Sequence, residues 1–156
     1  MIEIKVTNTV NKPLKDLWKV SATEFEKVGF WATGIFRSWK TEDHDRVCET
    51  SFGKLYEKIT LKDKKNHRIE IDAKGLPFFV KKFIGSWQFK KITNNKTEVT
   101  ITLNLKTMPI IGSIMGLMMK PKLQKAIEVT MKDYITYLET GKISERKQRE
   151  KDSRKK

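Results

Sequence analysis

The sequence holds few side chains that could carry out catalysis. Its two histidines, His44 and His67, lie in a charged turn and at the start of a predicted strand, and neither has a partner at the spacing of a metal site or a Ser-His-Asp triad. Cys48, the single cysteine, lies in a predicted strand, where we expect a buried, unreactive thiol. Glu57 is the only candidate for a general acid or base. No P-loop or dinucleotide motif is present, so we expect no cofactor and no metal.

Two charged residues are predicted on apolar strand faces, where an unpaired charge is costly. Arg37 lies two residues before Trp39 and shares its strand face, and Glu57 likewise shares a face with Ile59. Either these charges pair, or a bulge turns them outward, or they form a polar anchor at the bottom of an apolar pocket. We favour pairing or outward rotation over the polar anchor.

The elements that would position these residues follow from periodicity. Seven segments alternate apolar and polar residues as half-buried strands do. They are residues 2–10, 35–40, 46–52, 54–62, 67–73, 84–92 and 97–106. After the turn at residues 11–13, two short helices are expected, with Gly29 ending the second.

A long helix closes the ordered part of the sequence. Between Pro121 and Gly141, apolar residues recur at spacings of three and four, as on one face of a helix. The helix either begins at Pro121 or starts earlier and bends there. This order of elements predicts an α+β fold, in which a seven-stranded antiparallel sheet is covered by the long helix.

Charge divides the chain into two parts. The net charge is +14 over 156 residues, and residues 142–156 contribute eight basic and three acidic residues but only one apolar one. We therefore expect one domain over residues 1–141, followed by a basic, disordered tail. The single cysteine and the lack of a basic-then-apolar N-terminal segment favour a cytoplasmic protein. We expect it to be a monomer.

At this point the sequence resembles a known family. The opening NKPLKDLWKV, the run Gly53-Lys54-Leu55-Tyr56-Glu57, the strand Gly85-Ser86-Trp87-Gln88-Phe89 and the closing LQKAIEVTMKDYITYLETGK look like the START-like (SRPBCC, Bet v 1-like) superfamily. Within it, the chain is most similar to the bacterial polyketide cyclase/dehydrase and lipid-transport type. The resemblance implies a helix-grip fold, with a curved sheet wrapped around the C-terminal helix and an apolar cavity between them. Members bind lipids, sterols, polyketides or other hydrophobic molecules, and some are cyclases or dehydratases.

The residues expected to line this cavity come from the inward strand faces and from the long helix. They are Arg37, Trp39, Glu57, Ile59, Ile71, Trp87, Phe89, Leu103, Met115, Met119, Ile127 and Met131. The methionines suit either ordinary core packing or a surface that fits varied apolar ligands.

Two unusually apolar loops are expected at one edge of the sheet, where the cavity would open. They contain Leu76, Phe78, Phe79, Lys81, Lys82, Met108, Ile110 and Ile111. The loops either close on each other or form an exposed patch with a lysine rim, which would suit weak contact with an anionic membrane.

The sequence thus favours a non-catalytic binder or carrier of a hydrophobic small molecule or lipid. The first alternative is a cyclase- or dehydratase-type enzyme that uses Glu57. The second is nucleic-acid or ribosome binding, motivated by the positive charge. We do not expect the second, because basic and aromatic residues do not interleave in a known RNA-binding motif.

Overall fold

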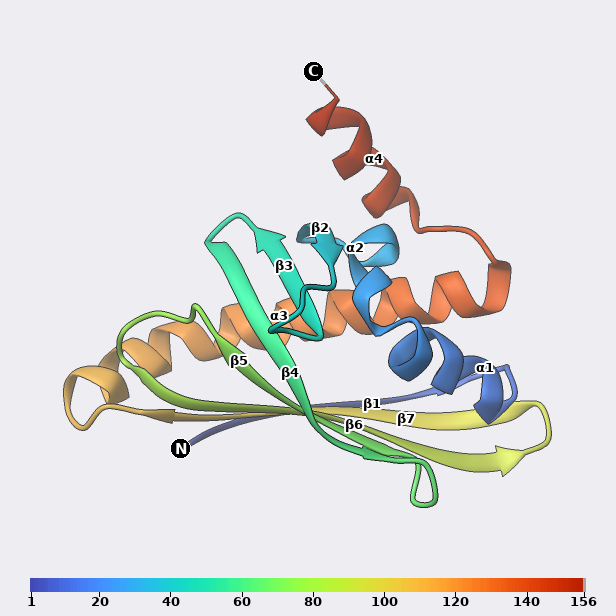
Figure 1. Cartoon of the computed structure of the whole chain (residues 1–156), viewed down its shortest axis with the longest axis horizontal. Helices are drawn as coiled ribbons and strands as arrows, with labels where there is room; N and C mark the ends of the chain where they lie inside the picture. The colour runs from blue at the N-terminus through green and yellow to red at the C-terminus, as the bar shows by residue number, and fades with distance from the viewer. Residues whose placement is uncertain (156) are drawn as a thin grey trace.

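The structure, a computed structural model, describes residues 1–155 and consists of a sheet, a long helix and several short helices (Figure 1). The strands are β1 (Ile2–Val10), β2 (Ile35–Trp39), β3 (Arg46–Thr50), β4 (Gly53–Asp63), β5 (Arg68–Lys74), β6 (Val80–Thr93) and β7 (Lys96–Thr107). The helical elements are α1 (Leu14–Trp18), η1 (Lys19–Thr23), η2 (Phe25–Lys27), α2 (Val28–Trp31), α3 (Ile111–Thr140) and α4 (Glu145–Arg154).

The seven strands form one antiparallel sheet in the order β1-β7-β6-β5-β4-β3-β2, which confirms the predicted α+β fold. The helical segment from α1 to α2 carries the chain from the β1 edge to the β2 edge. Register shifts interrupt the β2–β3, β4–β5 and β6–β7 pairs. Because bulges bend a strand and increase its twist, these shifts help the sheet to curve towards α3.

Helix α3 lies along the inner face of this sheet, and among the strands its backbone comes closest to β1 and then to β7 (Figure 1). It begins at Ile111 and runs through Pro121, so the longer of the two predicted helices is the observed one. Gly141 ends it in the left-handed conformation (φ 73°), which costs glycine little. Met131 and Tyr134 are fully buried in the main core cluster, which anchors the C-terminal half of α3.

The C-terminal segment departs from the expected disordered tail, because residues 145–154 form helix α4. Ser144 caps this helix by accepting a hydrogen bond from the Lys147 backbone N–H. Lys147 is fully buried although its neighbours are charged. The segment therefore docks through polar contacts, which its composition does not reveal. Lys156, the last residue of the expected tail, lies outside the described residues.

Candidate functional site

The candidate site is the apolar inner face of the sheet, on which α3 packs. Ile71, Gly85 and Leu103 are cross-strand neighbours on β5, β6 and β7, and Leu103 also pairs with Ile4 of β1. Cross-strand partners share a face, so this row points towards α3. Trp87 and Phe89 follow Gly85 at intervals of two residues on β6, so they lie on the same face. Trp87 pairs there with the buried Ile69 and Ile101. Ile71, Trp87, Phe89 and Met131 belong to the main core cluster, and Leu103 belongs to a smaller one.

Several side chains of this inner face are only partly buried. Ile59, Trp87 and Ile127 pack against the main core cluster, and Met119 packs against a smaller cluster around Ile4, Leu103 and Leu105. Leu123, which was not among the predicted ligand-binding residues, belongs to the same partly buried set. Its position four residues after Met119 would have revealed it. These side chains pack against the core without being fully enclosed by it.

Gly85 is a second feature that the sequence did not single out. It occupies the inner face of β6, a strand in the middle of the sheet, and contributes no side chain there. A Cβ at this position would lie 3.3 Å from the Phe83 ring and 3.5 Å from Leu103 Cδ2. Glycine inside a strand often marks a place where another group approaches closely. Here the Phe83 ring and the Leu103 side chain pack over the glycine.

Glu57 faces the inner side, as predicted, and is paired. Arg46 Nε donates to Glu57 Oε2 over 2.5 Å, Arg46 also donates to the Phe25 carbonyl, and the Cys48 thiol donates to the same Glu57 oxygen over 3.4 Å. The guanidinium stacks on the Phe25 ring at 3.8 Å. Burial raises the pKa of the Cys48 thiol to about 12, so this cysteine is protonated and unreactive. The pairing interpretation therefore holds for Glu57, and Arg46 is its unrecognised partner.

Arg37 and Trp39 were predicted to line the cavity, and this prediction is wrong. A register shift between Ile35 and Arg37 places Arg37 opposite Glu49, and the two side chains form a 2.7 Å ion pair in solvent. Trp39 lies on the same face, and the Arg37 guanidinium is 5.4 Å from its ring. Strand alternation cannot detect a bulge, and one extra residue reverses which side chains face inward.

The two residues contribute instead to a surface groove of about 640 Å³ between the short helices, β2 and α4. Its aromatic wall includes Phe30 and Trp31, and Lys151 of α4 lies 4.0 Å from the Phe30 ring. Tyr137 of α3 also lines this groove.

The two apolar loops meet, as their topology predicted. The Met108 N–H donates to the Phe79 carbonyl over 2.8 Å, and Val80 pairs with Thr107. Phe79 is buried and so is not part of an open mouth, whereas Phe78 and Ile110 are about three-quarters exposed, at 77% and 78%. The contact between the loops therefore buries the Phe79 ring and leaves the Phe78 ring exposed.

The remaining predicted residues of this end differ in exposure. Leu76 and Met108 are half-buried, whereas Lys81, Lys82 and Ile111 are exposed. Met115, which was predicted to line the cavity, is 39% exposed instead, because Gly112 and Gly116 are the residues in the first turns of this helix that face the sheet. A groove of about 650 Å³ lies where β5 and β6 separate beyond the Asp72–Ile84 pair, and Leu76, Lys81 and Lys82 contribute to its walls.

Within residues 1–155, no group of His, Cys, Asp and Glu side chains is arranged to hold a metal ion. None of the helices in this part of the chain is both long enough and apolar enough to cross a membrane.

Comparison with known proteins identifies the family. The profile of the family described as "Polyketide cyclase / dehydrase and lipid transport" matches residues 1–139, so the chain belongs to this family. No curated protein shows significant sequence similarity to it.

Solved structures share the fold at low sequence identity. XoxI from Bacillus cereus superposes with a TM-score of 0.74 at 14% identity, covering 90% of this chain and 97% of that one. A START superfamily protein from Mycobacterium smegmatis gives 0.69 at 12% identity, covering 90% and 99%. Norcoclaurine synthase from Thalictrum, solved as a point mutant with a transition-state analogue, gives 0.69 at 14% identity, covering 88% and 92%. These similarities establish a START-like, helix-grip fold.

Proposed function

We propose that the protein binds, and carries, a hydrophobic small molecule or lipid between the inner face of its sheet and helix α3. The observation that carries this proposal is the apolar inner face of the sheet, on which Ile59 and Trp87 stay partly buried, as do Met119 and Ile127 of the helix that packs on it. Family membership supports this interpretation, because the family description includes lipid transport.

The chemistry of the site favours binding over catalysis. Glu57, the only acid nominated from the sequence, has its buried carboxylate engaged by Arg46 and approached by the Cys48 thiol. A general acid or base must reach the substrate proton, and Oε2 of this carboxylate is already occupied by the Arg46 guanidinium and the Cys48 thiol. The walls around it are apolar, which suits recognition by shape and hydrophobicity.

Native mass spectrometry of protein purified from its own host tests the proposal most directly, since a bound hydrophobic molecule would add mass that disappears on denaturation. A fluorescent fatty-acid probe provides the equilibrium measurement. We expect the wild-type protein to bind such a probe, with higher fluorescence in the apolar site.

A matched pair of variants locates the binding site. Met119→Trp fills space between α3 and the sheet, whereas Met118→Trp adds the same bulk on the exposed side of the helix. We expect the first to weaken probe binding by about tenfold or more, equivalent to about 1.4 kcal/mol, and the second to leave it unchanged. The proposal fails if no molecule co-purifies and no probe binds, or if both variants bind the probe like the wild type.

A further inference from the structure

In the first turns of α3, small residues face the sheet and large apolar residues face solvent, which is the reverse of an ordinary amphipathic helix. Gly112 and Gly116 are buried, and a Cβ on them would come within 2.7 Å of Thr107 Cβ and 2.5 Å of Ile2 Cδ1. These glycines allow the helix to touch the sheet closely. The large apolar side chains of the same turns point away, and Leu117 and Met118 are 76% and 70% exposed. A helix usually buries its large apolar residues, so this exposed face indicates a binding surface.

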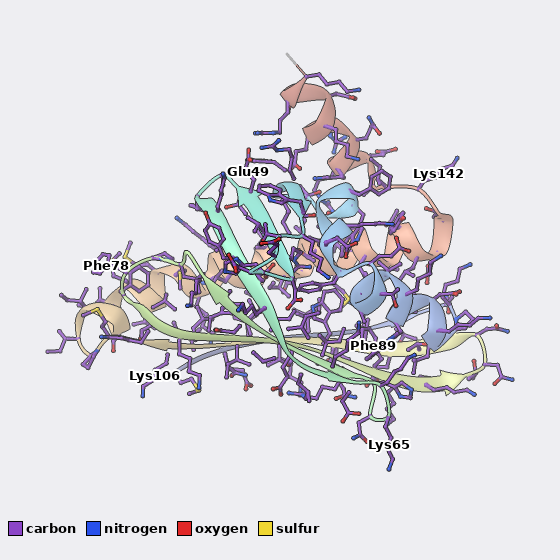
Figure 2. The ribbon with its side chains drawn as sticks, viewed as in Figure 1. Glu49, Lys65, Phe78, Phe89, Lys106 and Lys142 are labelled. Carbon is purple, nitrogen blue, oxygen red and sulfur yellow. The ribbon has the colours of Figure 1, made fainter. Side chains whose placement is uncertain are left out.

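The exposed face continues onto the neighbouring loop. The hydrogen bond between Met108 and Phe79 holds the start of α3 beside the β5–β6 loop, where Phe78 projects outward (Figure 2). We call this surface the apolar end. It consists of Phe78, Ile110, Ile111, Ile114, Met115, Leu117 and Met118.

Lysines accompany the apolar end. Lys82 and Lys106 are cross-strand partners on β6 and β7, and Figure 2 shows Lys106 at the same end of the molecule as Phe78. Between residues 99 and 127 the sequence has no acidic residue. The exposed lysines of the two loops and of the first half of α3 are Lys81, Lys82, Lys106, Lys120, Lys122 and Lys125. Glu70 and Asp72 line the same groove as Lys81 and Lys82, but the other lysines, on β7 and α3, come from a segment without acidic residues. Exposed apolar side chains with lysines around them match the apolar interior and anionic headgroups of a lipid bilayer.

We propose that the apolar end docks reversibly on an anionic lipid bilayer, with the apolar side chains inserted among the lipids and the lysines among the headgroups. A second copy of this chain fits the surface less well. Two apolar ends facing each other would bring their lysines together, and like charges across an interface oppose association. An anionic membrane neutralises the same lysines and also covers the apolar side chains.

Docking in this orientation would place the groove between β5 and β6 near the lipid. The groove between β5 and β6 has walls that include Leu76, Lys81 and Lys82, so it opens beside the docking surface. Docking does not depend on the proposed function. Exchange of a hydrophobic ligand with the bilayer does depend on the proposed function.

Co-sedimentation of the full-length protein with vesicles tests the docking. We expect binding to phosphatidylcholine vesicles that contain phosphatidylglycerol and little binding to pure phosphatidylcholine. Raising the salt from about 0.1 M to about 1 M shortens the screening length from about 10 Å to about 3 Å and should weaken binding. Combining Phe78→Ser, Leu117→Ser and Met118→Ser should lower the partition coefficient by at least about tenfold, and the reduction should persist at both salt concentrations. Phe52→Ser is the matched control, because Phe52 is 95% exposed in the β3–β4 turn.

A charge-reversal pair separates the electrostatic contribution. Lys81→Glu with Lys82→Glu should reduce binding severalfold at low salt and have little effect at high salt. The control pair is Lys64→Glu with Lys65→Glu, which makes the same change in net charge in the β4–β5 turn, away from Phe78 (Figure 2). A smaller effect of the control pair supports docking through the apolar end, and equal effects contradict it.

A labelled variant reports insertion directly, even if the triple variant is unstable. The only native thiol, Cys48, is buried, so a polarity-sensitive fluorophore on Met118→Cys reports on α3 alone. We expect its emission to shift to shorter wavelength on anionic vesicles, and the same fluorophore on Phe52→Cys to show no shift.

Three results would overturn the proposal: equal binding of the wild type and the triple variant, no emission shift at position 118, or a dimer in sedimentation velocity that the triple variant dissociates without any vesicle binding. Probe binding without vesicles is measured separately, so loss of docking and loss of the ligand site are distinguishable.

Discussion

Replacement of Lys147 by methionine tests whether α4 is an integral part of the fold. The Lys147 side chain is fully buried, and its Nζ donates to the Ile35 carbonyl over 2.7 Å and to Glu150 Oε1 over 2.6 Å. The other Glu150 oxygen accepts the Gly34 N–H at 2.7 Å. Lys147 and Glu150 therefore fasten α4 to the loop that leads into β2.

The expected loss follows from what the substitution leaves behind. Methionine keeps an apolar stem of similar length but removes the cation, so the Ile35 carbonyl loses its donor, which costs about 1–3 kcal/mol if it stays buried. Breaking a fully buried ion pair costs about 3–5 kcal/mol. The Glu150 side chain is 14% exposed and keeps its bond to Gly34, so the total should lie lower, at about 2–4 kcal/mol. For a chain of this length, that corresponds to a fall in Tm of roughly 5–12 °C.

Thermal unfolding followed by circular dichroism measures this loss, with Lys155→Met as the control. Lys155 lies next to the end of the same helix, but its side chain is 76% exposed and its Nζ is 3.8 Å from Asp152. An exposed pair contributes little, so this variant should stay within about 0.5 kcal/mol of the wild type. If both variants melt like the wild type, α4 does not stabilise the domain and residues 142–156 are dispensable, as their composition suggests.

Two further predictions concern buried polar groups. Burial raises the pKa of the Cys48 thiol to about 12, against the lowering effect of Arg46. The thiol should therefore not react with a disulfide reagent at neutral or mildly alkaline pH until the protein unfolds. Fast labelling of the native protein would contradict its burial. The phenol oxygen of Tyr134 lies 2.7 Å from the Ser21 hydroxyl and 3.1 Å from the Leu17 carbonyl, and Tyr134→Phe removes this partner from both groups. The substitution should lower the free energy of unfolding by about 1–3 kcal/mol in urea titrations. A change below about 0.5 kcal/mol would show that another group replaces the phenol.

Periodicity predicted most of the fold, because each strand alternates and the second half of α3 repeats with helical spacing. Ile71, Leu103 and Phe89 are inward because their strands keep a regular register with their neighbours. The prediction failed on β2, where one register shift turned Arg37 and Trp39 outward. Bulges depend on backbone pairing across strands, which the sequence of a single strand does not contain.

The beginning of α3 was ambiguous for a different reason. Residues 107–119 carry no charge, so they show no contrast between a polar and an apolar face. The glycines decide the packing, since Gly112 and Gly116 lie four residues apart and face the sheet together. Their spacing was visible in the sequence, but only the structure shows that the large side chains face solvent as a result.

Helix α4 was missed because its docking depends on polar pairs between distant positions. Asp133 of α3 is fully buried and accepts hydrogen bonds from the Ser144 hydroxyl, Arg146 and the Thr33 backbone N–H. No apolar periodicity marks such contacts. One local signal was present, because Ser144 followed by Glu145 is a favourable start for a helix.

The two halves of α3 differ in the contacts that attach them to the rest of the domain. The C-terminal half is fixed by Met131 and Tyr134 in the core and by Asp133, whose buried carboxylate ties it to α4 and to the loop before β2. The first turns touch the sheet through Gly112 and Gly116, which bury little apolar area, and Met119 and Leu123 after them are only partly buried. Pro121 has no N–H to donate back to the preceding turn, so the helix is also less bonded between its halves. Local stability follows buried contacts, so the end of α3 that carries the exposed apolar residues is also the end that opens at the lowest cost. A ligand entering between sheet and helix would pass this end, which is the end proposed to meet the lipid.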